Sequence, residues 1–243
     1  MGPHKEHVSE ENGMNQSQQY LETLSAHVLS LKQEARSLAA AADILAAAEA
    51  SDRLIHVFGT EPAAASLITG LFFRPGALKQ INPILDPSLD PAHGAYRSAM
   101  CLELDGLAPC ILDYYEYVEA GEPILLLGSD PALPLFSQAL VWAKRKGLRP
   151  IAVLSGDSAS TPCDADVVLY THGSYADTLV QAGGAAAGGE QTVLMAALLH
   201  ALIIETLERL SDPAAHIWSG THFVDIAENQ AEIDRLLFRI RHL

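Results

Sequence analysis

The first third of the chain carries apolar residues three or four positions apart. Between residues 16 and 50 these are Leu21, Leu24, Val28, Leu31, Leu38, Ala41, Ile44 and Leu45. This spacing predicts a long helix or a pair of helices with an apolar stripe along one side. The stripe is wider than packing on a sheet requires, so we expect a partner helix, which a second subunit could supply. Residues 1–15 are polar and aperiodic, and this predicts a flexible tail.

Short apolar runs then alternate with helical segments. The runs at 54–58, 124–127, 150–154 and 165–170 predict buried strands, and a short strand is expected near residues 84–85. An alanine-rich helix is predicted to end near Phe73, and another to run from Pro134 to Lys146. This alternation predicts a parallel sheet with helices on both faces, in which ligands bind beyond the carboxyl ends of the strands.

The last quarter of the chain is predicted to be helical. A helix from Glu190 to Leu210 is apolar on nearly every side, which predicts that it is buried at an interface between subunits. It follows a flexible connection rich in glycine and alanine, 183–189, and an amphipathic helix is predicted at 225–243. The proline-rich segment 74–92 is expected to be mostly loop. We therefore expect residues 16–243 to form a single domain.

Composition and charge disfavour several classes of protein. The formal net charge is -15, with Lys and Arg thinly spread, which argues against a nucleic-acid surface. The three cysteines show neither a disulfide pattern nor a metal-binding spacing, and we expect no metal and no cofactor. The longest apolar run is shorter than the roughly 20 residues of a membrane span, and the start has no secretory signal pattern. We therefore expect a cytoplasmic protein without membrane contact.

Several stretches, taken in order, resemble one known family. They are IHVFGT, LFFRPGALKQINPILDP, HGAYRS, PILLLGSD and GGEQTVLMAALLHALI. Together they are similar to the SIS (sugar isomerase) domain family, in an uncharacterised bacterial branch related to phosphoheptose isomerases. The resemblance implies a three-layer α-β-α sandwich around a five-stranded parallel flavodoxin-like sheet. It also implies a homodimer or larger homo-oligomer and a sugar or sugar phosphate as the ligand.

In that family, two turns rich in glycine and hydroxyl groups bind a phosphate dianion through backbone N–H groups at helix N-termini. Here the corresponding turns read GTEP (59–62) and GSDP (128–131). Glu61 and Asp130 place carboxylates where they can satisfy the same donors as a phosphate. The resemblance therefore implies a ligand site with weakened phosphate binding, made of Gly59, Thr60, Glu61, Gly128, Ser129 and Asp130.

The remaining candidates come from the same resemblance. The isomerases of the family use an acidic residue just before a Leu-aromatic-aromatic-Arg stretch as the base, and here Thr69 and Gly70 stand there. His200, in the last core helix, and His93, in the long loop, are the candidate catalytic histidines. Further candidate ligand-binding residues at the sheet edge are Ser155, Glu190 and Thr192. Each has a plainer alternative: a polar turn, a helix cap, or a core or loop histidine.

The sequence leaves three functions open. The first is a protein that binds a sugar or phosphosugar with weakened or lost catalysis. The second is an active aldose–ketose isomerase of a phosphosugar, in which His200 and His93 transfer protons. The third is a dimeric scaffold whose helix N-termini are capped by the chain's own carboxylates.

Overall fold

A five-stranded parallel sheet forms the centre of the molecule. The computed structural model describes residues 15–115, 117–156, 162–174, 176–220 and 226–243, so the predicted tail lies outside the described residues except for Asn15. The strand order is β2 (Ile81–Ile84), β1 (Ile55–Gly59), β3 (Pro123–Gly128), β4 (Arg149–Leu154) and β5 (Val167–Tyr170). All neighbouring strands are parallel, as the alternation of strands and helices predicts.

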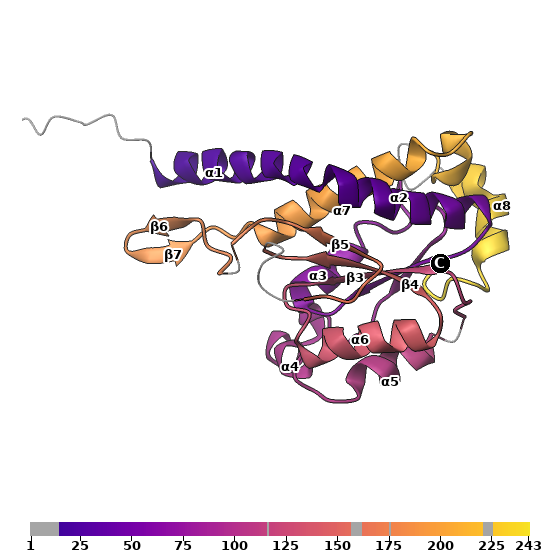
Figure 1. Ribbon diagram of the computed structural model, residues 1–243, viewed down its shortest axis with the longest axis horizontal. Coiled ribbons are helices and arrows are strands. Elements are labelled where there is room, and N and C mark those ends of the chain that lie inside the picture. The colour runs from indigo at the N-terminus through magenta and orange to yellow at the C-terminus, as the bar shows by residue number, and fades with distance from the viewer. Residues whose placement is uncertain (1–14, 116, 157–161, 175, 221–225) are drawn as a thin grey trace, which may run out of the picture.

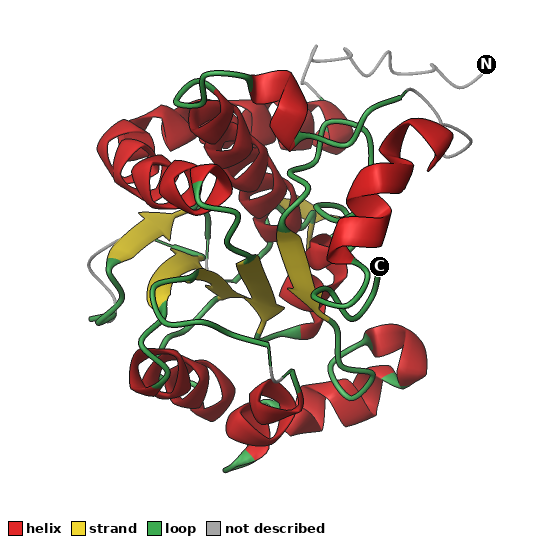
Figure 2. Cartoon of the chain, turned by 90° about the vertical axis from the view of Figure 1, so that its right-hand side faces the viewer, coloured by secondary structure: helices red, strands yellow, loops and turns green. Residues whose placement is uncertain are grey.

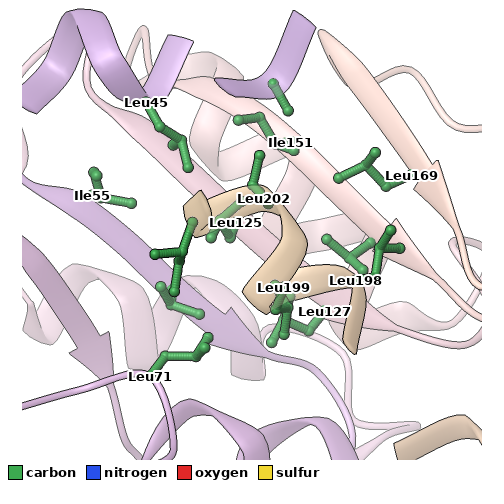
Figure 3. Close-up of a cluster of buried hydrophobic side chains, with 14 of the residues drawn as sticks. Leu45, Ile55, Leu71, Leu125, Leu127, Ile151, Leu169, Leu198, Leu199 and Leu202 are labelled. Carbon is green, nitrogen blue, oxygen red and sulfur yellow. The ribbon is translucent and has the colours of Figure 1, made fainter. Parts of the chain in front are cut away.

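Helices cover both faces of this sheet, which confirms the three-layer sandwich. One face carries α2 (Ala35–Ala50) and α7 (Gln191–Leu207), and the other carries α5 (Leu107–Tyr114) and α6 (Pro134–Arg145) (Figure 1 and Figure 2). Successive strand residues point to opposite faces, so Leu125 packs with α2 and α7 and Leu126 with α5 and α6. Figure 3 shows the first of these two clusters, where α7 meets the sheet.

The N-terminal helix is present but is divided into two helices. α1 (Gln16–Ser30) begins at a capping box formed by Asn15 and Gln18, and the 3-10 segment Leu31–Glu34 joins it to α2. α1 has no buried residue and projects from the sandwich (Figure 1). Leu24 and Val28 of the apolar stripe pack against the core, whereas Leu21 and Leu29 are 58% and 59% exposed.

A small hairpin replaces the connection that was expected before α7. It consists of β6 (Val180–Ala182) and β7 (Ala185–Ala187) and lies beside α1 (Figure 1). Its turn is Gly183-Gly184, with φ angles of 58° and 84° that glycine adopts without strain. The strands beside the turn consist largely of alanine, which has low strand propensity, so the sequence did not indicate them.

Two helices end earlier than predicted. α3 (Pro62–Ile68) stops before Phe73, whose φ of 42° is not helical. α8 (Ile226–Leu236) stops before the C-terminal turn. The segment 74–92 contains β2 and the start of the turn Pro91–His93, and it leads to α4 (Ala95–Cys101).

One polar network is buried within the sheet. The Nε2 atom of His56 lies 2.8 Å from Oε2 of Glu122, and the Asn82 amide donates to Nδ1 of His56 at 3.0 Å. Glu122 also accepts from the backbone N–H groups of Leu54 and Glu119. These bonds hold the pKa of Glu122 below its usual range despite burial. His56 therefore has a structural position within the sheet.

Candidate ligand-binding site at the carboxyl edge of the sheet

Two glycine-containing loops meet where β1 and β3 end. A Cβ atom on Gly59 would lie 2.4 Å from the backbone nitrogen of Ala65, and one on Gly128 would lie 2.5 Å from the Thr60 hydroxyl. Both positions require glycine because a side chain would push the loops apart. The Thr60 hydroxyl is buried and donates to the Leu127 carbonyl at 3.0 Å. The hydroxyl joins the two loops, and a ligand contact of Thr60 stays a prediction.

Glu61 occupies the hydrogen-bond donors of the second loop. Its Oε1 atom accepts from the backbone N–H of Ser129 at 2.5 Å and from the Ser129 hydroxyl at 2.6 Å. Glu61 stands at the N-cap position of α3, but its side chain makes no bond to that helix. The carboxylate thus crosses from the β1 loop to the β3 loop instead of capping its own helix. The Ser129 N–H and hydroxyl, which could bind an anionic ligand, are therefore already bonded to the Glu61 carboxylate.

Asp130 satisfies a donor in its own loop. Its Oδ1 atom accepts from the backbone N–H of Ala132 at 2.8 Å, which closes a turn before α6. The N-cap of α6 is Leu133, whose side chain cannot accept a hydrogen bond. As expected, the Asp130 carboxylate occupies a backbone donor at this edge, although the donor belongs to its own turn and not to the first residue of α6.

Asp177 provides a third carboxylate at the sheet edge, and sequence reasoning missed it. Its Oδ1 atom accepts from the backbone N–H groups of Glu190 at 2.6 Å and Gln191 at 2.9 Å. These are the first free donors of α7, so Asp177 caps that helix from a distant loop position. The plainer alternative was that the side chain of Glu190 or Thr192 caps α7. No such side-chain bond caps the helix.

Glu190 points into the protein and not toward a ligand. Its side chain is fully buried, its Oε1 atom accepts from the backbone N–H of Ser174 at 2.6 Å, and its Oε2 atom pairs with Nδ1 of His27. These contacts join α1, the segment after β5 and α7. The side chain of Glu190 therefore has a structural position, in contrast to the ligand contact that the resemblance implied.

A small cavity lies between α3 and the start of α7. Four polar side chains, four apolar side chains and one glycine line it: Glu61, Ser155, Gln191, Thr192, Ala63, Ala64, Leu67, Met195 and Gly128. Its volume is about 20 Å³, which is room for about one water molecule. The Ser155 hydroxyl donates to Oε1 of Gln191 at 2.8 Å and closes the cavity further. The fold thus brings four of the predicted ligand residues, Glu61, Gly128, Ser155 and Thr192, to one cavity, and among the described residues this cavity is too small for a sugar.

His200 lies away from this cavity. It follows Gln191 by nine positions on α7, which is about 13 Å along a helix. Its side chain is exposed, whereas Leu198 and Leu202 form the buried side of the helix. Partial desolvation of the ring and the Arg74 guanidinium lower the pKa of His200, which favours the neutral imidazole.

His93 lines a second and larger cavity. This cavity measures about 370 Å³ and is bounded by α3, the segment after β2 and the C-terminus. His93 is 58% exposed, and its Nδ1 atom lies 3.3 Å from Oδ2 of Asp90. The two candidate catalytic histidines are therefore not brought together in the single chain.

Metal-binding clusters and membrane-spanning helices are both absent from the part of the chain that is described. No group of three or more His, Cys, Asp or Glu side chains is placed there to bind a metal ion. In the same residues, no helix combines the length and the apolar character needed to cross a bilayer.

The fold and its edge loops define an α/β sandwich in which hydrogen-bond donors suited to an anion lie at the carboxyl ends of the strands. Residues 19–155, more than half of the chain, match the family model described as SIS domain. The chain therefore belongs to the SIS domain family, as the resemblance indicated.

Its relatives include proteins named UPF0309. The chain is 28% identical over 210 residues to one from Brucella ovis, which covers 81% of this chain and 84% of the relative. It is 29% identical over 180 residues to one from Brucella canis, which covers 70% and 74%.

Two solved structures have a similar fold. Phosphoheptose isomerase GmhA from Neisseria gonorrhoeae gives a TM-score of 0.50 at 14% identity, over 78% of this chain and 99% of that one. The sugar isomerase domain of the RpiR transcription factor from Sphaerobacter thermophilus gives 0.51 at 15% identity, over 90% and 97%. At these identities the likeness shows the fold alone.

Proposed function

We propose that this protein binds a carbohydrate derivative and that its isomerase activity is weakened or lost. Membership of the SIS domain family and the two solved neighbours support a sugar-related ligand. The observation on which the rest depends is the pair of hydrogen bonds from Ser129 to the Glu61 carboxylate. A phosphate bound by this loop must displace that carboxylate or lie next to it.

Electrostatic repulsion makes a phosphate a poor ligand beside Glu61. Two unit charges about 4 Å apart repel by roughly 1 kcal/mol in water and about 4 kcal/mol at an effective dielectric constant near 20. One carboxylate therefore lowers the affinity for a phosphate monoanion by about fivefold to a thousandfold. Asp130 lies in the same loop region, and the chain has a net charge of -15. We expect a sugar to bind better than its phosphate ester.

The position of the catalytic base in the isomerases offers no carboxylate here. Thr69 and Gly70 stand at that position, and the Thr69 hydroxyl donates to the Ser66 carbonyl at 2.9 Å. A hydroxyl of ordinary acidity is too weak a base to remove a proton from carbon. Glu61, the closest carboxylate earlier in the helix region, is bound to Ser129. This arrangement supports the loss of the family's proton transfer.

A thermal-shift screen of matched sugars and sugar phosphates tests the proposal. A ligand at 100 times its dissociation constant adds about 2.7 kcal/mol of stability, which raises the Tm of a protein of this size by roughly 5–11 °C. Neutral and amino sugars should raise the Tm, and their phosphate esters should not at the same concentration. A larger shift with the phosphate esters would contradict the charge argument.

An active phosphosugar isomerase remains the alternative, with His93 and His200 as proton-transfer groups. An isomerisation assay with fructose-, arabinose- and sedoheptulose-type phosphates separates it from a binding protein. Turnover that His200→Ala abolishes would establish the enzyme. No sugar-induced Tm shift and no turnover would instead favour the scaffold, which the self-bound carboxylates of the edge loops also suit.

We further propose a cytoplasmic homodimer or larger homo-oligomer. Leu21 and Leu29 of α1 and Ile204 of α7 are 58%, 59% and 60% exposed, and exposed apolar helix faces are typical of interfaces. Replacing Leu21 and Leu29 together by glutamate should give a folded monomer in light scattering. A wild-type protein that is itself monomeric would contradict this part of the proposal.

A further inference from the structure

The larger cavity lies on the opposite side of α3 from the small one. Ala65, Ser66 and Thr69 line the larger cavity, whereas Ala63, Ala64 and Leu67 line the smaller, which places the two on opposite faces of the helix. Leu85, Asp86, Pro87, Asp90, His93 and His242 complete the larger wall. Its volume of about 370 Å³ is within the usual range of about 300–1,000 Å³ for small-molecule sites.

The hydrogen bonds of Tyr115 determine which nitrogen of His242 carries the proton. The phenol oxygen accepts from the backbone N–H of Leu85 at 3.1 Å and donates to the Leu85 carbonyl at 2.8 Å. Its single proton is then used, yet Nε2 of His242 lies 2.8 Å away. The phenol has no second proton for His242, so Nε2 of His242 must donate to the phenol oxygen. In the neutral ring, Nδ1 of His242 is then an unprotonated acceptor.

The other hydroxyl and carboxylate groups of the cavity are also acceptors. The hydroxyls of Ser66 and Thr69 donate their protons to the carbonyls of Pro62 and Ser66, so toward the cavity they can only accept. Asp86 and Asp90 add two carboxylates. Oδ1 of each accepts from a backbone N–H of its own turn at 2.8 Å, and Oδ1 of Asp86 also accepts from the Ser88 hydroxyl. Oδ2 of Asp90 lies 3.3 Å from Nδ1 of His93. No Lys or Arg side chain is among the described residues that line the cavity.

We propose that this cavity binds an unphosphorylated sugar that carries an amine, with His242 and Asp86 as acceptors. A wall of acceptors matches a ligand rich in hydroxyl donors. The Asp86 carboxylate, which pairs with no Lys, Arg or His side chain of the described residues, matches an ammonium group. Burial and the Arg241 guanidinium lower the pKa of His242, which keeps its ring neutral and accepting at pH 7. The assignment rests on the proposed function, and it places the sugar here instead of at the edge loops.

Calorimetric titration of the full chain with three probes tests this assignment. Glucosamine should bind most tightly, glucose about tenfold more weakly because it lacks the charged donor, and glucose 6-phosphate more weakly still. His242→Ala and Asp86→Asn should each weaken glucosamine binding about tenfold. Asp212→Asn is the control, because it removes the same charge from an exposed turn where the side chain makes no capping bond.

The outcomes separate the two proposals. If none of the sugars binds the wild-type protein, the proposed function fails and the cavity assignment fails with it. If glucosamine binds the wild type, His242→Ala and Asp86→Asn equally well, only the cavity assignment fails. Nitrogen NMR of the His242 ring adds a readout that needs no variant: the proton should reside on Nε2, and glucosamine should shift the Nδ1 signal. A proton on Nδ1 would overturn the assignment.

Discussion

Replacement of Glu61 by alanine should turn the loop after β3 into an anion site. In the wild type, the Ser129 N–H and hydroxyl both donate to the Glu61 carboxylate, at 2.5 and 2.6 Å. Without that carboxylate, both donors are free for phosphate. The variant should therefore gain affinity for inorganic phosphate and for sugar phosphates.

The size of this gain follows from the charge that is removed. Relief of one unit charge about 4 Å from a bound phosphate gives roughly 1–4 kcal/mol, or about fivefold to a thousandfold in affinity. Glu61→Gln removes the charge but keeps an acceptor beside Ser129, so its gain should be smaller. Without ligand, Glu61→Ala should lose roughly 1.5–3 kcal/mol of stability with its charge-assisted hydrogen bonds, which lowers the Tm by roughly 3–12 °C.

Calorimetric titration with inorganic phosphate and with a sugar phosphate at low ionic strength measures the gain. Glu22→Ala is the matched control, because it changes the net charge equally at an exposed position of α1. Equal phosphate affinities for Glu61→Ala and Glu22→Ala would refute the reasoning, since they would show that Glu61 does not compete for the loop.

Three further changes test a helix cap and two buried polar contacts of the fold. Asp177→Ala should cost about 1 kcal/mol in urea unfolding because α7 loses its cap, and an unchanged midpoint would contradict the cap. His56→Ala should cost about 3–5 kcal/mol because Glu122 stays buried without its partner, and a loss below about 1 kcal/mol would show that the network is not coupled. Burial raises the pKa of Glu49, which lies 2.9 Å from His216, from 4.5 to about 7. The folded state therefore binds this proton more tightly than the unfolded chain, so the stability that it contributes is complete below pH 4.5 and is lost as the pH rises to 7. Glu49→Gln should flatten the decline in stability over that interval, and an unchanged slope would show that another group titrates.

The sheet could be predicted because its signal is local. β1, β3, β4 and β5 each contain a short apolar run, and the helices between the strands have apolar residues at a period near 3.6. β2 contains Asn82 and Pro83, so the sequence indicated only a short strand near residues 84–85. The order of the strands and the exposure of α1 depend on the whole fold, and for these the family resemblance and the structure were needed. The hairpin at 180–187 has an alanine-rich sequence with no strand pattern, so only its glycine turn could have indicated it.

The residues of the site were easier to predict than their contacts. Glu61 could be identified from the sequence because a carboxylate at a helix N-terminus can occupy the donors that a bound phosphate would use. Its bond to Ser129 could not be predicted, since it depends on the close approach of two loops that Gly128 permits. Asp177 precedes Glu190 by 13 positions and reaches α7 only through the intervening hairpin. His242 gave no signal in the sequence, because its cavity forms only when the C-terminus packs beside Leu85 and Tyr115.

A crystal structure determined in concentrated phosphate tests most directly whether the chain's own carboxylate replaces an anion at the sheet edge. The account predicts the Glu61 carboxylate bonded to Ser129, with no phosphate on that loop. A phosphate bonded to the Ser129 N–H, with Glu61 turned away, would contradict it.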